Sequence, residues 1–216
     1  RILAEEELSE NQVNLFIKYL DLMETETRRI NRIVSNLLIF ARNSKIEVGK
    51  YDVNALIEQT LLLNSNLLKI YGVRVIEEFE KNLPLVTASD DQLKQVFMNL
   101  ISNAAESLAG TSRAKLVIMT ASSSDDQQVV IRFRDNGSGI DPELQPKIFE
   151  PFYTTKKKGK GVGLGLSVVY GIIKDHGGKI EVNSTPGLGT EFIITLYLEM
   201  SSEQQRSNIE KSMGLE

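Results

Sequence analysis

Apolar side chains at heptad spacing constrain the N-terminal part of the chain more than any other feature does. Over residues 9–43 they recur at alternating intervals of four and three residues, and Thr27 is the only polar member of the series. This spacing predicts one long helix with a narrow apolar seam. Because one helix cannot bury such a seam alone, we expect partner helices in a homodimer, with packing on the chain's own domain as the alternative. The seam consists of Phe16, Leu20, Met23, Thr27, Ile30, Val34, Leu37 and Ala41.

The composition narrows the classes of protein that fit. The net charge of -4 gives no general attraction to nucleic acid or to anionic membranes. The absence of cysteine excludes disulfides and thiolate zinc sites. No apolar run reaches the ~20 residues that span a bilayer, and the acidic start is unlike a signal peptide. We therefore expect a cytoplasmic chain without nucleic-acid or membrane contact, although a longer parent protein could carry an anchoring segment upstream.

The order of predicted elements divides the chain into three parts. Residues 1–48 form the long helix, residues 49–200 an α/β domain, and residues 201–216 a polar tail that we expect to be disordered. In the domain, Asp52 has the character of a helix N-cap, and glycines end the last helix. The order predicts a sheet with helices on one face. We predict helices at 53–70, 90–108 and 163–175, and strands at 73–79, 85–88, 115–121, 128–134, 179–183 and 190–198.

The helix over residues 90–108 carries the first motif with chemical content. Its apolar face is opposed by a polar stripe at helical spacing that contains Gln95, Asn99, Asn103 and Glu106. Two asparagines one turn apart offer neutral oxygens to a hard cation such as Mg²⁺, whose other ligands are usually water and substrate phosphates. A solvated helix face is the simpler interpretation of the same stripe.

The segment DNGSGI at residues 135–140 follows a predicted strand. A carboxylate at Asp135 can accept a hydrogen bond from the exocyclic amine of adenine, and the glycines allow the backbone to approach a planar ring. The alternative is a hairpin turn, because Asn-Gly pairs are frequent there. The residues that follow do not read as a strand, and this weakens the hairpin interpretation.

The segment GKGVGLGL at residues 159–166 runs directly into a helix. Its glycines free backbone amides to face an anion, and a helix N-terminus adds about half a positive charge. Lys156, Lys157, Lys158 and Lys160 gather positive charge just before it in an acidic chain. The pattern predicts a phosphate site, although it lacks the Lys-Ser/Thr ending of a P-loop. The segment GLGT at residues 187–190 is explained by a tight turn alone, or by a second wall of the same site.

In this order, the four motifs and the segment FEPFYTTK at residues 149–156 resemble the catalytic domain of bacterial sensor histidine kinases, within the wider ATPase group of DNA gyrase, Hsp90 and MutL. The segment RINRIVSNLLIFAR at residues 29–42 is similar to the second helix of that family's dimerisation and phosphotransfer hairpin. The nitrogen-regulation type of sensor kinase is the most similar subtype. The resemblance implies an α+β fold, a two-layer α/β sandwich with a mixed sheet of about five strands and three helices.

The resemblance also implies roles for single residues. Asn103 and Asn99 match the family's magnesium-binding asparagines, and Asp135 matches the aspartate that reads adenine. Lys156 lies where a lid cation could reach the phosphates, so catalysis is expected to depend on Asn99 and Lys156. The implied cofactors are ATP and Mg²⁺. The other positions matched to ATP binding are Gly137, Gly139, Ile140, Phe149, Phe152, Lys160, Gly161, Val162, Gly163, Leu164, Gly165, Leu166 and Thr190.

Two positions bear on the reaction. The hydrolysing relatives carry a glutamate four residues before the magnesium-binding asparagine, where this chain has Asn99. A neutral amide cannot deprotonate water, so transfer to a histidine, and then to the receiver domain of a response regulator, is favoured over hydrolysis. The only histidine, His176, matches the family's helix terminator, where a histidine favourably caps the helix C-terminus. We therefore expect the phosphoacceptor helix to precede this chain in its parent, or to have been lost.

Two other functions stay open. A serine kinase of the anti-sigma type shares the nucleotide fold but not the heptad helix. A nucleotide-dependent scaffold without catalysis fits the missing phosphoacceptor, although the intact glycine motifs argue against it.

Overall fold

The structure is a computed structural model that describes residues 10–41, 48–123, 127–155 and 162–199. The chain divides into two compact units, residues 1–42 and residues 43–216. Within the described residues, no helix combines the length and the apolar character needed to cross a membrane.

In the first unit the described residues form α1 (Glu10–Ala41), which is 32 residues long and confirms the predicted long helix over this range. Of the heptad seam, Phe16, Leu20, Met23 and Ile30 are exposed. The side chains of Val34, Leu37 and Ala41 lie outside the described residues. These apolar side chains are not buried within α1 itself, and the homodimer stays a prediction.

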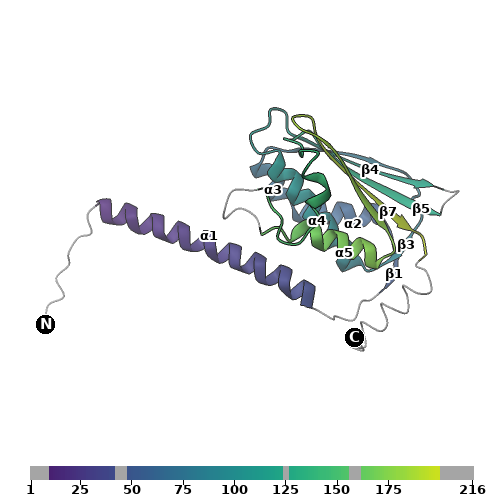
Figure 1. Ribbon diagram of the computed structural model, residues 1–216, viewed down its shortest axis with the longest axis horizontal. Helices are drawn as coiled ribbons and strands as arrows, with labels where there is room; N and C mark the ends of the chain where they lie inside the picture. Colours follow the sequence, from purple (N-terminus) through teal and green to yellow (C-terminus); the bar gives the residue numbers. More distant parts are fainter. Residues whose placement is uncertain (1–9, 42–47, 124–126, 156–161, 200–216) are drawn as a thin grey trace. The chain divides into compact units, whose positions relative to one another are not determined.

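The second unit is built on a five-stranded mixed sheet with the order β2-β4-β5-β7-β6 (Figure 1). β2 and β4 are parallel, and the other neighbouring strands are antiparallel. This arrangement confirms the predicted mixed sheet of five strands. The strands are β2 (Arg74–Phe79), β4 (Lys115–Ser123), β5 (Gln128–Asp135), β6 (Lys179–Thr185) and β7 (Gly189–Tyr197).

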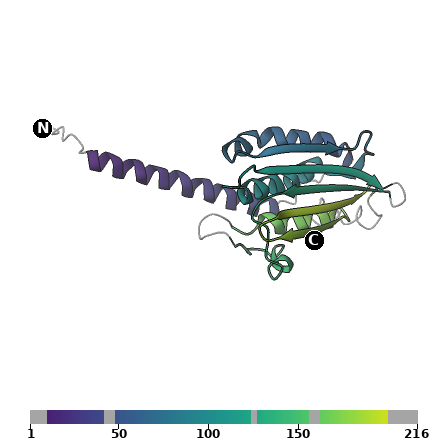
Figure 2. The same ribbon diagram turned by 90° about the horizontal axis from the view of Figure 1, so that it is seen from above.

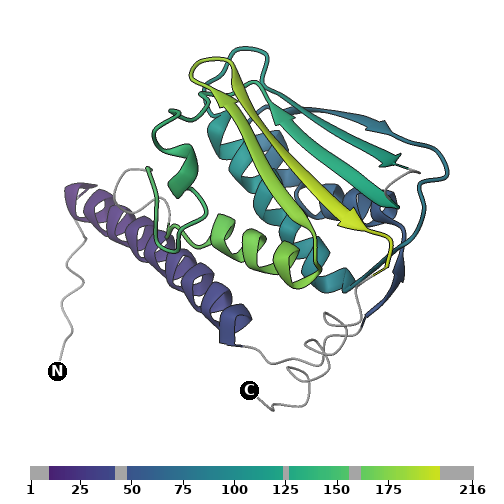
Figure 3. The same cartoon turned by 45° about the vertical axis from the view of Figure 1, so that its right-hand side comes forward.

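Helices cover one face of this sheet, as predicted (Figures 2 and 3). α4 (Asp90–Ser107) lies between α2 (Val53–Leu63) and α5 (Gly165–Asp175), because it packs against both. The apolar face of α4 is fully buried, and Phe97 stacks on Phe133 of β5 with ring centroids 5.8 Å apart. Burial of such large side chains is the main stabilising contribution, about 1.5–3 kcal/mol for each one. The core therefore fixes α4, which carries both candidate asparagines.

A small two-stranded sheet was only half predicted. β1 (Gly49–Tyr51) pairs antiparallel with β3 (Val86–Ala88). β1 was not predicted, because it is too short to give a periodic signal.

Asp52, the residue after β1, is the predicted N-cap of α2. Its Oδ1 accepts hydrogen bonds from the backbone amides of Asn54 at 2.9 Å and Ala55 at 3.3 Å.

The prediction of one helix over residues 53–70 was wrong, because the chain breaks at Asn64 into α2 and α3 (Ser65–Ile70). The Asn64 side-chain amide donates to the Thr60 carbonyl at 2.8 Å, and the Asn64 backbone amide approaches the same oxygen at 3.1 Å. An asparagine that bonds to the preceding turn competes with the helical ladder and ends it.

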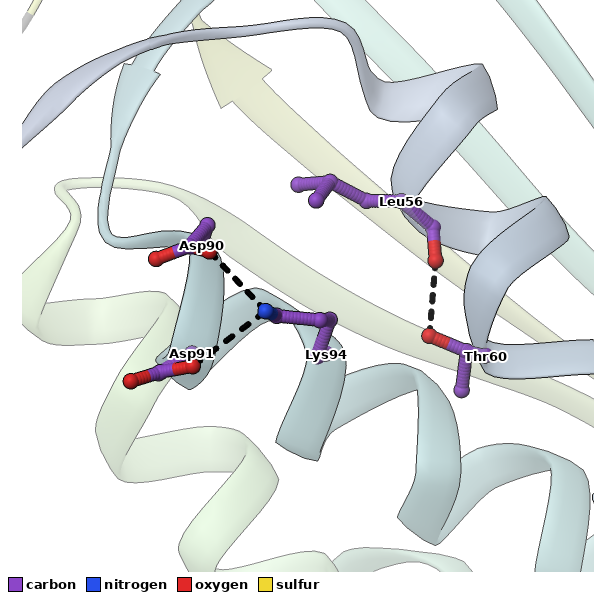
Figure 4. Close-up of polar contacts among 5 residues, drawn as sticks. All are labelled: Leu56, Thr60, Asp90, Asp91 and Lys94. Atoms are coloured by element: carbon purple, nitrogen blue, oxygen red, sulfur yellow. Dashed lines mark hydrogen bonds and ion pairs between the residues drawn. The ribbon is translucent and has the colours of Figure 1, made fainter. Parts of the chain in front are cut away.

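Polar residues near the junction of α2 and α4 have local partners (Figure 4). The buried Thr60 hydroxyl donates to the Leu56 carbonyl at 2.7 Å, which explains a polar side chain on the buried face of α2. On the first turn of α4, the Lys94 ammonium contacts Asp90 at 2.9 Å and Asp91 at 3.2 Å. The hydrogen bond from Lys94 lowers the pKa of Asp90, so this carboxylate places negative charge at the helix N-terminus, where negative charge is favourable.

His176 is the C-cap of α5, as predicted. The side chain is 4 % exposed, and its Nδ1 donates to the Ile172 carbonyl at 2.8 Å. Its Nε2 accepts a hydrogen bond from the Ser89 amide at the start of α4, at 3.0 Å. Burial lowers the pKa of His176, against the Ile172 carbonyl and the Asp175 charge, which raise it. His176 is thus a neutral link between the end of α5 and the start of α4.

We expect this link to make stability depend on pH. A folded-state pKa below the ordinary value of 6.5 means that the unfolded chain binds a proton which the folded chain does not. The free energy of unfolding should fall as the pH drops below 6.5, by at most about 1.4 kcal/mol per pH unit from this residue. Urea denaturation between about pH 7.5 and 5.5 measures it. The His176→Gln variant should lack this part of the slope, and parallel curves for the two proteins would contradict the assignment.

Candidate functional site

The two asparagines of α4 face the N-terminus of α5. A Cβ built on Gly165, the first residue of α5, would lie 3.4 Å from Asn99 Oδ1 and 3.9 Å from Asn103 Nδ2. Gly165 therefore leaves space beside both side chains, which are half-buried. A helix N-terminus presents unpaired amides and about half a positive charge, so an anion bound there would lie next to the two asparagine side chains.

α5 begins at Gly165 and not at the predicted Gly163, because Gly163 has a φ of +72°. A Cβ on Gly163 would lie 2.4 Å from the Phe152 carbonyl carbon and 2.6 Å from the backbone carbonyl oxygen of Tyr153. Only glycine fits this contact. It brings the backbone before residue 154 against the backbone before α5. Lys156, Lys160 and Gly161 lie outside the described residues.

The other predicted residues before and after the Gly163 contact differ in their burial. Phe149 packs on Tyr170 with ring centroids 5.6 Å apart and on Phe192 at 6.5 Å, so it is anchored to the core. Phe152 is 67 % exposed and has a φ of +65°. The remaining three, Val162, Leu164 and Leu166, flank the start of α5, where Leu164 is buried and Leu166 packs against the core. Any contribution of Leu164 to an anion site must come from its backbone.

Asp135 ends β5 and is 6 % exposed. Its Oδ1 accepts a hydrogen bond from the Gly137 amide at 2.8 Å and one from the Ser107 hydroxyl at 3.3 Å. Burial raises the pKa of Asp135, while Gly137, Ser107 and the Thr190 backbone amide lower it. A buried carboxylate held in one orientation, without a cation partner among these contacts, is typical of a binding site rather than of a structural ion pair.

The hairpin interpretation of residues 135–140 was wrong, because the chain leaves the sheet at Asn136. The Asn136 side chain accepts from the Lys115 amide at 2.7 Å and donates to the Arg113 carbonyl at 3.2 Å. Gly139, with a φ of +71°, lies against the turn between β6 and β7, where a Cβ would be 2.1 Å from the Thr185 oxygen. The glycines of this segment therefore allow it to pack against the turn that contains GLGT.

A hydroxyl pair connects that turn to Ile140. The Ser184 hydroxyl lies 2.9 Å from the Thr190 hydroxyl and accepts from the Ile140 amide at 2.8 Å. The Gln145 side-chain amide donates to the carbonyls of Ile140 at 3.1 Å and Ser184 at 2.9 Å. Asp135, Ser184 and Thr190 line a surface hollow of about 200 Å³. Ser107, Ser184 and Gln145 were not predicted, because no local pattern distinguishes them from other polar residues.

The side chains beside the N-terminus of α5 can be compared with the ligands that Mg²⁺ prefers. Among the described residues, no group of three or more His, Cys, Asp or Glu side chains could hold a metal ion. A cation beside α5 would be held by neutral asparagine oxygens and by the phosphates of a ligand, a combination that suits Mg²⁺. The space at Gly165 beside Asn99 and Asn103 is compatible with this arrangement.

Comparison with known families gives one match to this fold and site. Residues 88–200 match the family described as histidine kinase-, DNA gyrase B-, and HSP90-like ATPase. That stretch contains α4, the candidate asparagines, Asp135 and every glycine motif.

Known proteins similar to this chain are sensor kinases. The signal transduction histidine-protein kinase AtoS of Escherichia coli K12 is 38 % identical over 187 residues, which cover 87 % of this chain and 30 % of AtoS. The structure of full-length ShkA in complex with AMPPNP has a TM-score of 0.72 and 25 % identity over 90 % of this chain and 40 % of that one. The structure of histidine kinase ThkA with the response regulator protein TrrA has a TM-score of 0.67 and 28 % identity over 84 % and 51 %. The chain thus spans less than a third of the curated relative and about half or less of these two structures.

Proposed function

Since the chain belongs to the histidine kinase-, DNA gyrase B- and HSP90-like ATPases and is homologous to sensor histidine kinases, we propose that it is the Mg-ATP-binding catalytic part of such a kinase. The γ-phosphoryl group of ATP would pass to a histidine and from there to an aspartate of a response regulator. The observation that carries this proposal is the placement of Asn99 and Asn103 beside the N-terminus of α5. The complex of ThkA with TrrA supports a response regulator as the partner.

Each part of the site has a separate task in this proposal. The Asp135 carboxylate accepts a hydrogen bond from the exocyclic amine of adenine, and the close packing of Gly137 and Gly139 holds the segment that follows Asp135. The amides at the start of α5 bind phosphate oxygens and orient the γ-phosphoryl group. Asn99 and Asn103 would hold Mg²⁺, which when bound neutralises charge on the phosphates. Asn99 cannot act as a general base, so water beside the phosphate is not activated and the phosphoryl group is kept for the histidine.

We expect isothermal titration calorimetry to show binding of AMPPNP that depends on Mg²⁺. Adding EDTA should weaken binding, because the asparagines then face phosphate charge without a cation between them. A Gly165→Ala variant provides a second test, since its Cβ would enter the space beside Asn99. Absence of binding by the wild-type chain at about millimolar AMPPNP would refute the nucleotide site.

The phosphotransfer step needs its own assay. The chain is mixed with a separate helical hairpin that carries a phosphoacceptor histidine, and with ATP labelled at the γ-phosphate. Acid-labile label on the hairpin supports the histidine kinase. Label on a serine of an added protein would favour the anti-sigma type of kinase, and binding without any transfer would favour the scaffold.

A further inference from the structure

We propose that Ser107 is a positioning residue for nucleotide selection, whose hydroxyl holds the Asp135 carboxylate in the orientation that accepts a hydrogen bond from an amine. This inference rests on the proposed nucleotide site and adds a residue that was not predicted to belong to it. It follows from two hydrogen bonds that meet at one carboxylate oxygen.

The Ser107 hydroxyl is confined between Asp135 and Gly137. Ser107 is the last residue of α4, and its hydroxyl donates to Asp135 Oδ1 at 3.3 Å. A Cβ on Gly137 would lie 2.1 Å from Ser107 Oγ and 2.7 Å from Asp135 Oδ1. The hydroxyl therefore occupies the space that a side chain at residue 137 would fill. The absence of a side chain at Gly137 is therefore required for the position of this hydroxyl as well as for the conformation of the loop.

Both hydrogen bonds go to the same oxygen of the Asp135 carboxylate. Oδ1 receives the Gly137 amide at 2.8 Å and the Ser107 hydroxyl at 3.3 Å. Two donors on Oδ1 fix the plane of the carboxylate, and the Thr190 backbone amide is a further donor to this group. A carboxylate has about four lone-pair sites, so it can still accept from a ligand donor. Adenine offers an amine at that place, whereas hypoxanthine offers a carbonyl oxygen. An ionised carboxylate only accepts hydrogen bonds, and a protonated one also donates, so its ionisation decides between the two bases.

The surroundings of Asp135 make this hydroxyl matter. Leu116 of β4 and Thr190 of β7 are its strand neighbours, Ser107 faces it from α4 and Gly137 from its own loop. None of these groups carries a charge. Burial raises the pKa of Asp135 and only hydrogen bonds lower it, with Ser107 supplying one of them. Loss of the hydroxyl should raise this pKa further, so that protonation begins at a higher pH.

The test compares wild type and Ser107→Ala for binding of AMPPNP and of the corresponding inosine nucleotide, across about pH 5.5 to 8.5. We expect about three- to tenfold weaker AMPPNP binding by the variant near neutral pH. We also expect the loss to grow as the pH falls, because the variant protonates Asp135 first. The preference for the adenine nucleotide over the inosine nucleotide should shrink in the same pH range.

A matched control removes a hydroxyl from a different carboxylate. Ser122 donates to Glu80 at the far end of β4, so Ser122→Ala should keep the wild-type affinity and pH profile. If Ser107→Ala binds with wild-type affinity and pH profile, the inference is wrong while the nucleotide site stands. An equal loss at every pH and for both nucleotides, with a lower melting temperature, would reduce Ser107 to a structural role and also overturn it. Failure of the wild type to bind AMPPNP would instead remove the proposed function.

Discussion

Asp135→Asn is expected to abolish nucleotide binding while leaving the fold intact. The substitution replaces an acceptor by an amide whose NH₂ group can face the amine of adenine, so two donors would oppose each other in a buried place. Sites that hydrogen-bond a specific group discriminate by large factors, because a mismatch leaves buried polar atoms unpaired. We expect the affinity for AMPPNP to fall at least about 100-fold, measured by calorimetry in the presence of Mg²⁺.

The stability of the same variant makes the test specific. Burial raises the pKa of Asp135, so the ionised carboxylate of the folded chain is less favourable than in the unfolded chain. A neutral side chain of similar shape removes this cost at neutral pH, and the melting temperature should stay the same or rise. Asp141→Asn is the matched control, since Asp141 is exposed and its side chain accepts a local hydrogen bond from the Glu143 amide at 3.0 Å. Unchanged affinity of Asp135→Asn, or a collapse in its melting temperature, would contradict the assigned role.

Gly189→Ala is expected to be the most destabilising exchange in the β6–β7 hairpin, where Gly189 is the first residue of β7. Gly189 has a φ of +116°, a conformation that side chains rarely adopt. A Cβ there would lie 2.0 Å from the Asp135 carbonyl oxygen and 2.9 Å from Asn136 Cα, which are backbone atoms of the neighbouring strand end. These atoms cannot move without separating β5 from β7. We expect a loss of at least about 3 kcal/mol in the free energy of unfolding, measured by urea denaturation.

Gly187 supplies the control within the same turn. Its φ of +77° is also unfavourable for a side chain, but a Cβ there meets nothing within 4 Å. Gly187→Ala should therefore cost only the conformational penalty, about 1–2 kcal/mol. Similar losses for the two variants would show that strain in the turn, and not contact with the Asp135 backbone, explains both glycines. A larger loss for Gly189→Ala, together with weaker AMPPNP binding, would link this turn to the position of Asp135.

Much of the fold could be predicted from local patterns. The seam of α1, the apolar face of α4 and the alternation in β4, β5 and β7 are periodic over enough residues to identify helix and strand. The errors lie where a side chain competes with the backbone or where an element is very short. Asn64 ends α2 through a bond to Thr60, and β1 has only three residues. α5 begins after Gly163 because Gly163 packs against the backbone of Phe152, a residue that lies eleven positions earlier in the sequence.

The amino-acid sequence alone determined which chemical groups the proposed nucleotide site contains: the asparagines of α4, the carboxylate of Asp135 and the glycines before α5. It could do so because residue type and spacing are local properties. The tertiary structure decided how these groups meet, since Gly165 comes beside Asn99, and Ser107 beside Asp135, only when α4 packs against α5 and the sheet. It also decided the protonation of His176 and the altered pKa of Asp135, because burial depends on the whole packed core and not on neighbouring residues.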